Sequence, residues 1–282
     1  MQTTQLPTDA SLSGNVLFYS KPEPLSPEAH GKLGVNALDN PYAFVGQTNM
    51  VPLTVTEFAP AALNYPVVFL GDARAPVAIM GLNQNTNLFV EANGAYRADA
   101  YLPAFVRRYP FVFATQEDQG RMVLCIDRAA PMVSEGGETA LFAGGKPTPF
   151  TENAMKFCTD FEQERRRTES FVKLLQEHDL LTVREFNYTP RNADGSAGQP
   201  QKVAEFYGVS EEKLNALSAD TFKTLRDNGA LGQIYAHLMS LQNWDRLIVA
   251  AMDRANSTRV RQEKTRRPSS SSRSCWAMTM PF

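Results

Sequence analysis

The sequence predicts an α+β fold, with a β-rich, antiparallel N-terminal half and helices in the C-terminal half, packed as one body. Two patterns support this prediction. Short apolar runs alternate with turn residues from about residue 50 to residue 128, which is typical of antiparallel strands. After residue 151 the apolar residues recur at helical spacing. The 282 residues are 43% hydrophobic, which supplies enough apolar material for a sizeable core.

Hairpins account for the expected strands. Apolar runs at 67–70 and 77–80 flank turn residues, and the runs at 111–113 and 122–126 flank a polar turn in the same way. Between these pairs, Asn93-Gly94 is the dipeptide favoured by two-residue hairpin turns. We therefore expect an antiparallel, meander-like sheet in this part of the chain.

Helices follow from capping residues and apolar periodicity. Residues 102–109 predict a short helix within the strand-rich half, because Pro110 would end it. Thr151 is the expected N-cap of a long amphipathic helix, and Ser210 and Ser218 are those of two short ones. Residues 231–251 place their apolar side chains on one stripe, which predicts a last helix that faces the core.

Composition divides the chain into three parts. Residues 1–40 are rich in proline, glycine and polar residues and predict an irregular N-terminal segment, before a folded body over 41–252. Residues 253–282 predict a basic, low-complexity and disordered tail. Within it, residues 255–274 carry a net charge of +5 although the whole chain carries −2, so the body is mildly acidic. Because no aromatic residues are interleaved in this stretch, we expect no nucleic-acid binding.

The three cysteines predict neither a disulfide framework nor a metal site. Cys125, Cys158 and Cys275 are far apart, form no C-x-x-C pair and have no histidine at ligand spacing. They are expected to be buried or incidental thiols in a reducing compartment.

The N-terminal sequence predicts no signal peptide, because no lysine or arginine precedes Lys21 and the only apolar cluster before it is short. The most apolar stretch, 101–114, is split by two arginines and two prolines, so no membrane span is expected. A cytoplasmic location follows, with the cell surface, reached by a signal-independent route, as the alternative.

No cofactor is predicted. Gly145 and Lys146 lack the preceding glycine that a phosphate-binding loop requires, and the sequence holds no dinucleotide-binding glycine motif. Nor does it hold a nucleophile elbow or a zinc-protease motif.

A candidate pocket is assembled from the remaining chemistry-bearing residues. Asp127 follows a strand, where enzymes often place carboxylates, and His237 borders the apolar stripe of the last helix. The structural alternatives are a turn-initiating aspartate, arginines that pair with acids at a helix edge, and a hydrogen-bonded core histidine. The candidate lining residues are Tyr101, Arg107, Arg108, Asp127, His237 and Trp244.

Two motifs resemble the bacterial SapC family. Residues 101–111 read Tyr-Leu-Pro-Ala-Phe-Val-Arg-Arg-Tyr-Pro-Phe, and residues 234–244 read Ile-Tyr-Ala-His-Leu-Met-Ser-Leu-Gln-Asn-Trp. The resemblance spans residues 40 to 250, while the tail departs from the family's usual short ending. The family takes its name from a protein associated with a paracrystalline surface layer that protects a bacterial pathogen from serum.

The resemblance implies a non-catalytic accessory or component of the bacterial surface layer, with surface-layer or assembly proteins as its partners. It brings no catalytic residues with it. The alternative is a soluble cytoplasmic enzyme or small-molecule-binding protein of unknown substrate. In that case the six candidate lining residues should converge on one concave site.

Overall fold

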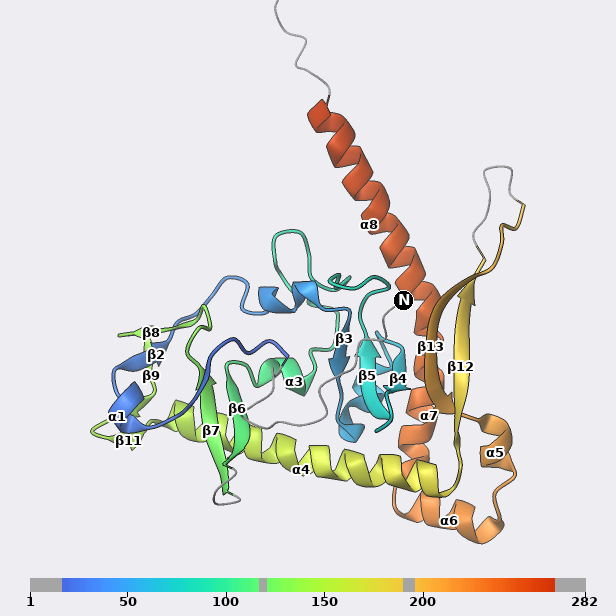
Figure 1. Cartoon of the computed structure of the whole chain (residues 1–282), viewed down its shortest axis with the longest axis horizontal. Helices are drawn as coiled ribbons and strands as arrows, with labels where there is room; N and C mark the ends of the chain where they lie inside the picture. The colour runs from blue at the N-terminus through green and yellow to red at the C-terminus, as the bar shows by residue number, and fades with distance from the viewer. Residues whose placement is uncertain (1–16, 117–120, 190–195, 267–282) are drawn as a thin grey trace, which may run out of the picture.

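The computed structural model describes residues 17–116, 121–189 and 196–266, and it confirms the α+β class. Its central feature is a five-stranded sheet in the order β12-β13-β4-β5-β3, with every neighbouring pair antiparallel. The strands are β3 (Met50–Pro52), β4 (Val67–Leu70), β5 (Ala75–Ile79), β12 (Leu181–Tyr188) and β13 (Gln201–Val209). The sheet lies on the right of Figure 1, where the β12–β13 hairpin extends beyond the shorter strands.

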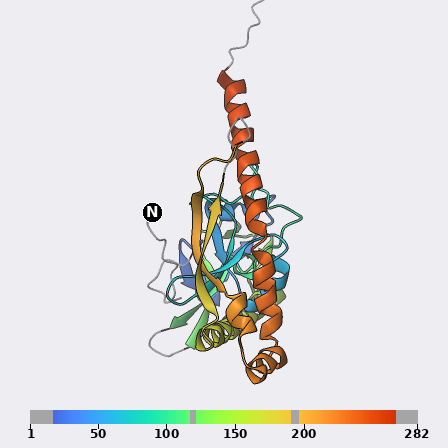
Figure 2. The same cartoon turned by 90° about the vertical axis from the view of Figure 1, so that its right-hand side faces the viewer.

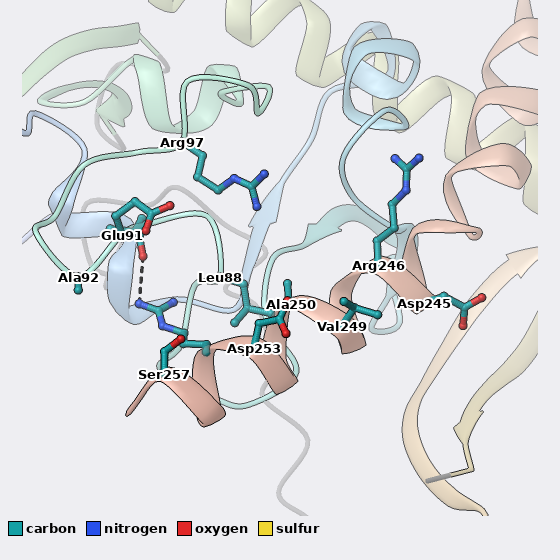
Figure 3. Close-up of a pocket in the computed structure, with 12 residues that line it drawn as sticks. Leu88, Glu91, Ala92, Arg97, Asp245, Arg246, Val249, Ala250, Asp253 and Ser257 are labelled. Carbon is teal, nitrogen blue, oxygen red and sulfur yellow. Dashed lines mark hydrogen bonds between the residues drawn. The ribbon is translucent and has the colours of Figure 1, made fainter. Parts of the chain in front are cut away.

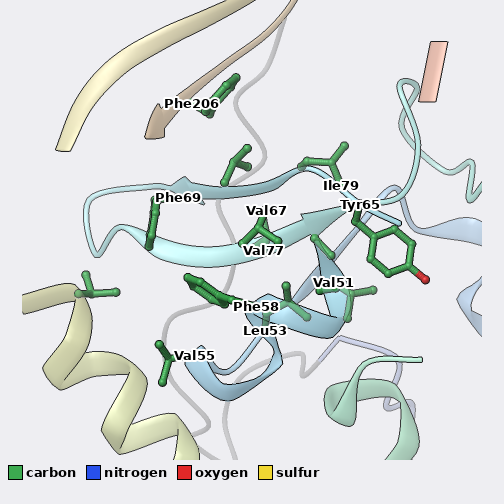
Figure 4. Packing of buried hydrophobic residues seen from close by; sticks show 14 of the residues in the cluster. Val51, Leu53, Val55, Phe58, Tyr65, Val67, Phe69, Val77, Ile79 and Phe206 are labelled. Atoms are coloured by element: carbon green, nitrogen blue, oxygen red, sulfur yellow. The ribbon is translucent and has the colours of Figure 1, made fainter. Parts of the chain in front are cut away.

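The main core lies against this sheet and is made mostly of strand and short-helix side chains (Figure 4). Phe58 opens helix α2 (Phe58–Ala61) directly after the 3₁₀ helix η2 (Val55–Glu57) and is fully buried. Its ring contacts Phe69 of β4 at 6.1 Å and Phe171 of helix α4 (Pro149–Glu177) at 5.8 Å between centroids. One aromatic side chain therefore joins the sheet to the long helix.

A second group of strands lies at the other end of the molecule, on the left of Figure 1. It contains the antiparallel sheets β1-β7-β6 and β8-β2-β9 and the pair β10–β11. Helix α4 runs beneath both groups and contacts β6, β11 and η2. The bounds are β1 (Pro22–Pro24), β2 (Leu33–Val35), β6 (Phe111–Gln116), β7 (Arg121–Asp127), β8 (Val133–Glu135), β9 (Thr139–Ala140), β10 (Phe142–Ala143) and β11 (Lys146–Pro147).

The N-terminal segment is more regular than its composition suggests. Residues 22–24 pair with the end of β7, residues 33–35 form the middle strand of a second sheet, and helix α1 (Pro27–His30) lies between them. These elements have three or four residues each, too few to show a period in the sequence. Residues 1–16 of this segment lie outside the described residues.

The predicted hairpins are partly confirmed. β4 pairs with β5 and β6 pairs with β7, as the apolar runs indicate. Around Asn93-Gly94 only one bridge forms, between Val90 and Tyr96, so this segment is a loop. The predicted short helix is one turn, α3 (Ala104–Arg107).

The C-terminal helices begin close to their predicted caps. α4 starts at Pro149, before Thr151, because proline fits the first turn of a helix. The hydroxyls of Ser210 and Ser218 accept hydrogen bonds from the backbone at the starts of α5 (Glu211–Asn215) and α6 (Ala219–Asp227). These two caps are confirmed.

The last predicted helix is two helices, α7 (Ala230–Ser240) and α8 (Asn243–Arg266). The break coincides with Ser240 and Asn243, whose side chains bond to the backbone of another segment. α8 projects from the body in both views (Figures 1 and 2) and continues to Arg266. Residues 253–266 of the expected tail are therefore helical, and 267–282 lie outside the described residues. Among the helices described, none combines the length and the apolar character that a bilayer span requires.

Candidate functional site

Asp127, at the end of β7, is fully buried and fastens the N-terminal segment to the second sheet group. Its two carboxylate oxygens accept hydrogen bonds from the backbone amides of Ser20, Lys21 and Ala129 at 2.9 to 3.0 Å. The Tyr109 hydroxyl donates a further bond at 3.3 Å. With four donors around it, the carboxylate is satisfied by its own fold.

Arg108 is buried in an aromatic enclosure. Its guanidinium carbon lies 4.2 Å from the ring centroid of Phe105, 4.5 Å from that of Phe161 and 5.9 Å from that of Tyr19. The side chain is 7% exposed, and its Nε has no hydrogen-bond partner within the described part of the chain. All three rings lie within cation–π distance of the guanidinium, and these contacts favour the buried cation.

Tyr101 and Arg107 lie next to each other around the buried carboxylate of Glu57. The Tyr101 hydroxyl donates to Glu57 Oε1 at 2.9 Å, and Arg107 Nη2 lies 3.4 Å from the same hydroxyl. The other carboxylate oxygen accepts from the backbone amide and the hydroxyl of Thr54, both at 2.8 Å. Glu57 therefore closes the first turn of η2. It also anchors Tyr101, which lies three residues before the start of α3.

His237 holds α7 against two strands of the central sheet. Its Nε2 accepts a hydrogen bond from the backbone amide of Val209, at the end of β13, at 3.0 Å. Its Nδ1 therefore carries the proton and donates to the carbonyl oxygen of Val67, on β4, at 2.8 Å. The ring is fully buried, and this burial lowers the pKa of His237 to about 4.

Two further side chains of the 234–244 motif form hydrogen bonds with the backbone just before β4 and within it. The Ser240 hydroxyl accepts from the Val67 amide at 2.9 Å. Asn243 Nδ2 donates to the carbonyl oxygens of Ala62 at 2.7 Å and Tyr65 at 3.2 Å. The spacing of three residues between His237, Ser240 and Asn243 thus follows one face of the α7–α8 turn.

Trp244, one position after Asn243, packs against β12 and β13. Its ring stacks on Phe186 of β12 at 4.9 Å and on Phe206 of β13 at 5.6 Å between centroids. It is 3% exposed, and its indole nitrogen has no partner within the described residues.

The six candidate lining residues fall into separate environments. Tyr101 and Arg107 contact each other. Arg108 lies over the ring of Tyr19, and Asp127 accepts a hydrogen bond from Tyr109. The rings of Tyr19 and Tyr109 contact each other, so Arg108 and Asp127 are linked only through these two tyrosines. His237 and Trp244 lie on the α7–α8 side of the central sheet. The sequence reasoning missed Glu57, Ser240 and Asn243. The capping-box spacing of Thr54 and Glu57 is a signal that could have identified Glu57. Ser240 and Asn243 could have been identified as polar residues on an otherwise apolar helix face.

A groove, which we call the α8 groove, lies elsewhere, between the loop 88–97 and α8 (Figure 3). It has a volume of about 820 Å³. Arg97 lines both this groove and a smaller hollow of about 350 Å³ beside Tyr96. None of the six candidate lining residues borders either space.

The described cysteines are structural. Burial raises the pKa of the Cys125 thiol to about 11 and that of Cys158 to about 12, so both remain protonated at neutral pH. In the described part of the chain no group of three His, Cys, Asp or Glu residues is arranged to hold a metal ion. Cys275 lies outside the described residues.

A comparison with protein-family models finds one that matches residues 25–247, and this model is described as SapC. The matched region contains both sequence motifs, at 101–111 and 234–244, and ends within the second turn of α8. Searches of curated proteins and of solved structures find no match to the chain.

Proposed function

Because the chain belongs to the SapC family, we propose that it is a non-catalytic accessory or component of the bacterial surface layer that acts by binding other proteins. The observation that carries the proposal is that the 234–244 motif has one buried, hydrogen-bonded face and one exposed face. Its polar residues His237, Ser240 and Asn243 point inward and bond to the fold, whereas Tyr235 and Met239 are exposed. The motif therefore fixes α7 in place and presents its outer face.

The exposed face offers apolar area that a protein partner can bury. Met239 is 67% exposed and Tyr235, one turn earlier on α7, is 45% exposed. Leu63, which follows the neighbouring helix α2, is 70% exposed. We call these three residues the α7 surface. Tyrosine and methionine are enriched in protein–protein interfaces, and grouped apolar exposure marks such sites more than single residues do.

Three buried groups of the kinds that catalysis uses support the same proposal, because each of them already has hydrogen-bond partners within the chain. Asp127, Glu57 and His237 form hydrogen bonds with backbone groups or with neighbouring side chains of the same chain. A general acid or base must instead reach a substrate atom within hydrogen-bond distance.

Cell fractionation with an antibody against the native protein tests the proposal. We expect a fraction of the protein to be released together with the surface layer when cells are treated with guanidinium chloride. Protein found only in the cytosol would contradict a role at the layer. A Met239→Asp variant should lose the layer-associated fraction, because a carboxylate placed in an apolar interface must be desolvated. A Met155→Asp variant on α4, where Met155 is 41% exposed, is the matched control and should behave as the wild type.

A further inference from the structure

The α8 groove is lined by equal numbers of acidic and basic side chains (Figure 3). The loop contributes Glu91 and Arg97, and α8 contributes Asp245, Arg246, Asp253 and Arg254. A ligand of a single charge, such as a nucleic acid or an anionic lipid surface, therefore gains no net attraction in the groove. A protein surface that carries both charges in a matching order fits it better.

Two of the charges on α8 have no opposite charge bound to them. Arg246 and Asp253 are exposed and line the same groove, and neither forms an ion pair within the described part of the chain. Arg246 Nη1 donates to the carbonyl oxygen of Leu63 at 3.3 Å, which leaves further guanidinium donors free to pair. The two residues are seven positions apart, about 10.5 Å along a helix, and lie on one helix face. Each can pair with an opposite charge from another molecule.

The surface between these two charges is apolar. Val249 and Ala250 lie midway between Arg246 and Asp253 on the groove side of α8, and Val249 is 57% exposed (Figure 3). A small residue such as alanine lets a second helix approach closely, and packed helices have axes 8 to 10 Å apart, about the size of one helix. The face of α8 thus has an apolar centre with a cation at one end and an anion at the other.

A second copy of α8 in antiparallel orientation is complementary to this face. With the two-fold axis between positions 249 and 250, Arg246 lies opposite Asp253 of the second copy, and Val249 lies opposite Ala250 of the second copy. Symmetry repeats both contacts, as in any two-fold interface. We propose that two copies of this chain form a symmetric dimer in which α8 of each copy lies antiparallel in the α8 groove of the other.

Other alignments of the two helices bring like charges together. A parallel pair in register sets Arg246 against Arg246 and Asp253 against Asp253. An antiparallel pair shifted by seven residues sets two arginines together for one direction of the shift and two aspartates for the other. Charge complementarity therefore favours the register centred on 249–250 over these alternatives. The helix is also accessible, because α8 projects from the body in both views (Figures 1 and 2).

The dimer goes beyond the proposed function and does not depend on it, since Leu63, Tyr235 and Met239 of the α7 surface do not line the α8 groove. Partly exposed ion pairs contribute modestly to affinity, so we expect a reversible dimer that weakens as salt is added.

Sedimentation equilibrium of the purified full-length chain tests the dimer. We expect the wild type to dimerise at protein concentrations below about 1 mM. Arg246→Glu and Asp253→Arg should each raise the dissociation constant at least about tenfold, because each replaces two contacts between opposite charges by two between like charges. Asp72→Arg, in the exposed turn after β4, is the matched control for the change of charge and should leave the constant within about twofold of the wild type.

Two rescue experiments identify the paired residues. The double variant Arg246→Glu/Asp253→Arg restores opposite charges across the axis and should return the dissociation constant to within about threefold of the wild type. An equimolar mixture of the two single variants should likewise form a heterodimer, because Glu and Arg then face each other at both ends. Circular dichroism checks that every variant is folded.

Three outcomes would overturn the proposal. A wild type that stays monomeric at about 1 mM would exclude the dimer and leave the α7 surface to be tested by itself. A dissociation constant unchanged in both single variants would assign the dimer to another surface. Failure of both the double variant and the mixture to dimerise would show that Arg246 and Asp253 do not face each other.

Discussion

Replacing Asp127 by alanine is expected to lower the free energy of unfolding by about 4 kcal/mol, because three backbone amides and one hydroxyl lose a buried acceptor together. Ser20 and Lys21 belong to the N-terminal segment, while Asp127 and Ala129 belong to the end of β7 and the turn after it. The loss therefore also releases the pairing between β1 and β7. Urea unfolding followed by circular dichroism measures the change.

Two companion variants separate the buried carboxylate from a general charge effect. Asp127→Asn keeps one acceptor oxygen and should lose about half as much stability. Asp160→Ala removes an exposed partner of Lys156 and should change the free energy of unfolding by less than about 1 kcal/mol. A loss of less than about 1 kcal/mol in Asp127→Ala would show that the backbone amides find other acceptors, contrary to the structure.

His237 is expected to make the protein lose about 3 kcal/mol of stability between pH 7 and pH 4. Burial lowers its pKa to about 4 in the folded state, below the ordinary value of 6.5. As the pH falls below 6.5 the unfolded chain binds a proton that the folded chain does not, so the unfolded state gains stability. The loss is complete once the pH has passed below the folded pKa.

The pH dependence of His237→Gln isolates this contribution. The variant should be less stable than the wild type at pH 7, because it loses at least one of the bonds to Val209 and Val67. The difference between the two proteins should then shrink by about 3 kcal/mol on going to pH 4, since glutamine does not titrate. Parallel stability curves for the two proteins would contradict a buried neutral imidazole.

Much of the fold follows from local sequence patterns, and the failures have identifiable physical causes. The β4–β5 and β6–β7 hairpins and the caps at Ser210 and Ser218 depend on neighbouring residues, so the sequence predicts them. The β1–β7 pairing joins residues about a hundred positions apart and has no local signal. The break between α7 and α8 is likewise set by contacts with residues 62–67.

The candidate site was harder to predict because residue type does not reveal hydrogen-bond partners. Asp127 and His237 are residues that catalysis often uses, and both are bonded to backbone groups in this fold. The structural interpretation of each, as a turn-initiating aspartate and a bonded core histidine, describes their contacts better than a shared pocket does. The α8 groove combines a loop with a helix some 150 positions later, so only the folded chain brings its walls together.

Co-sedimentation of the purified protein with isolated surface layers is the most direct test of the central claim, that this chain acts through an exposed protein-binding surface. The wild type and Met155→Asp should sediment with the layers, whereas Met239→Asp should remain in the supernatant with its free energy of unfolding unchanged within about 0.5 kcal/mol. Equal sedimentation of all three proteins, or sedimentation of none, would contradict the claim.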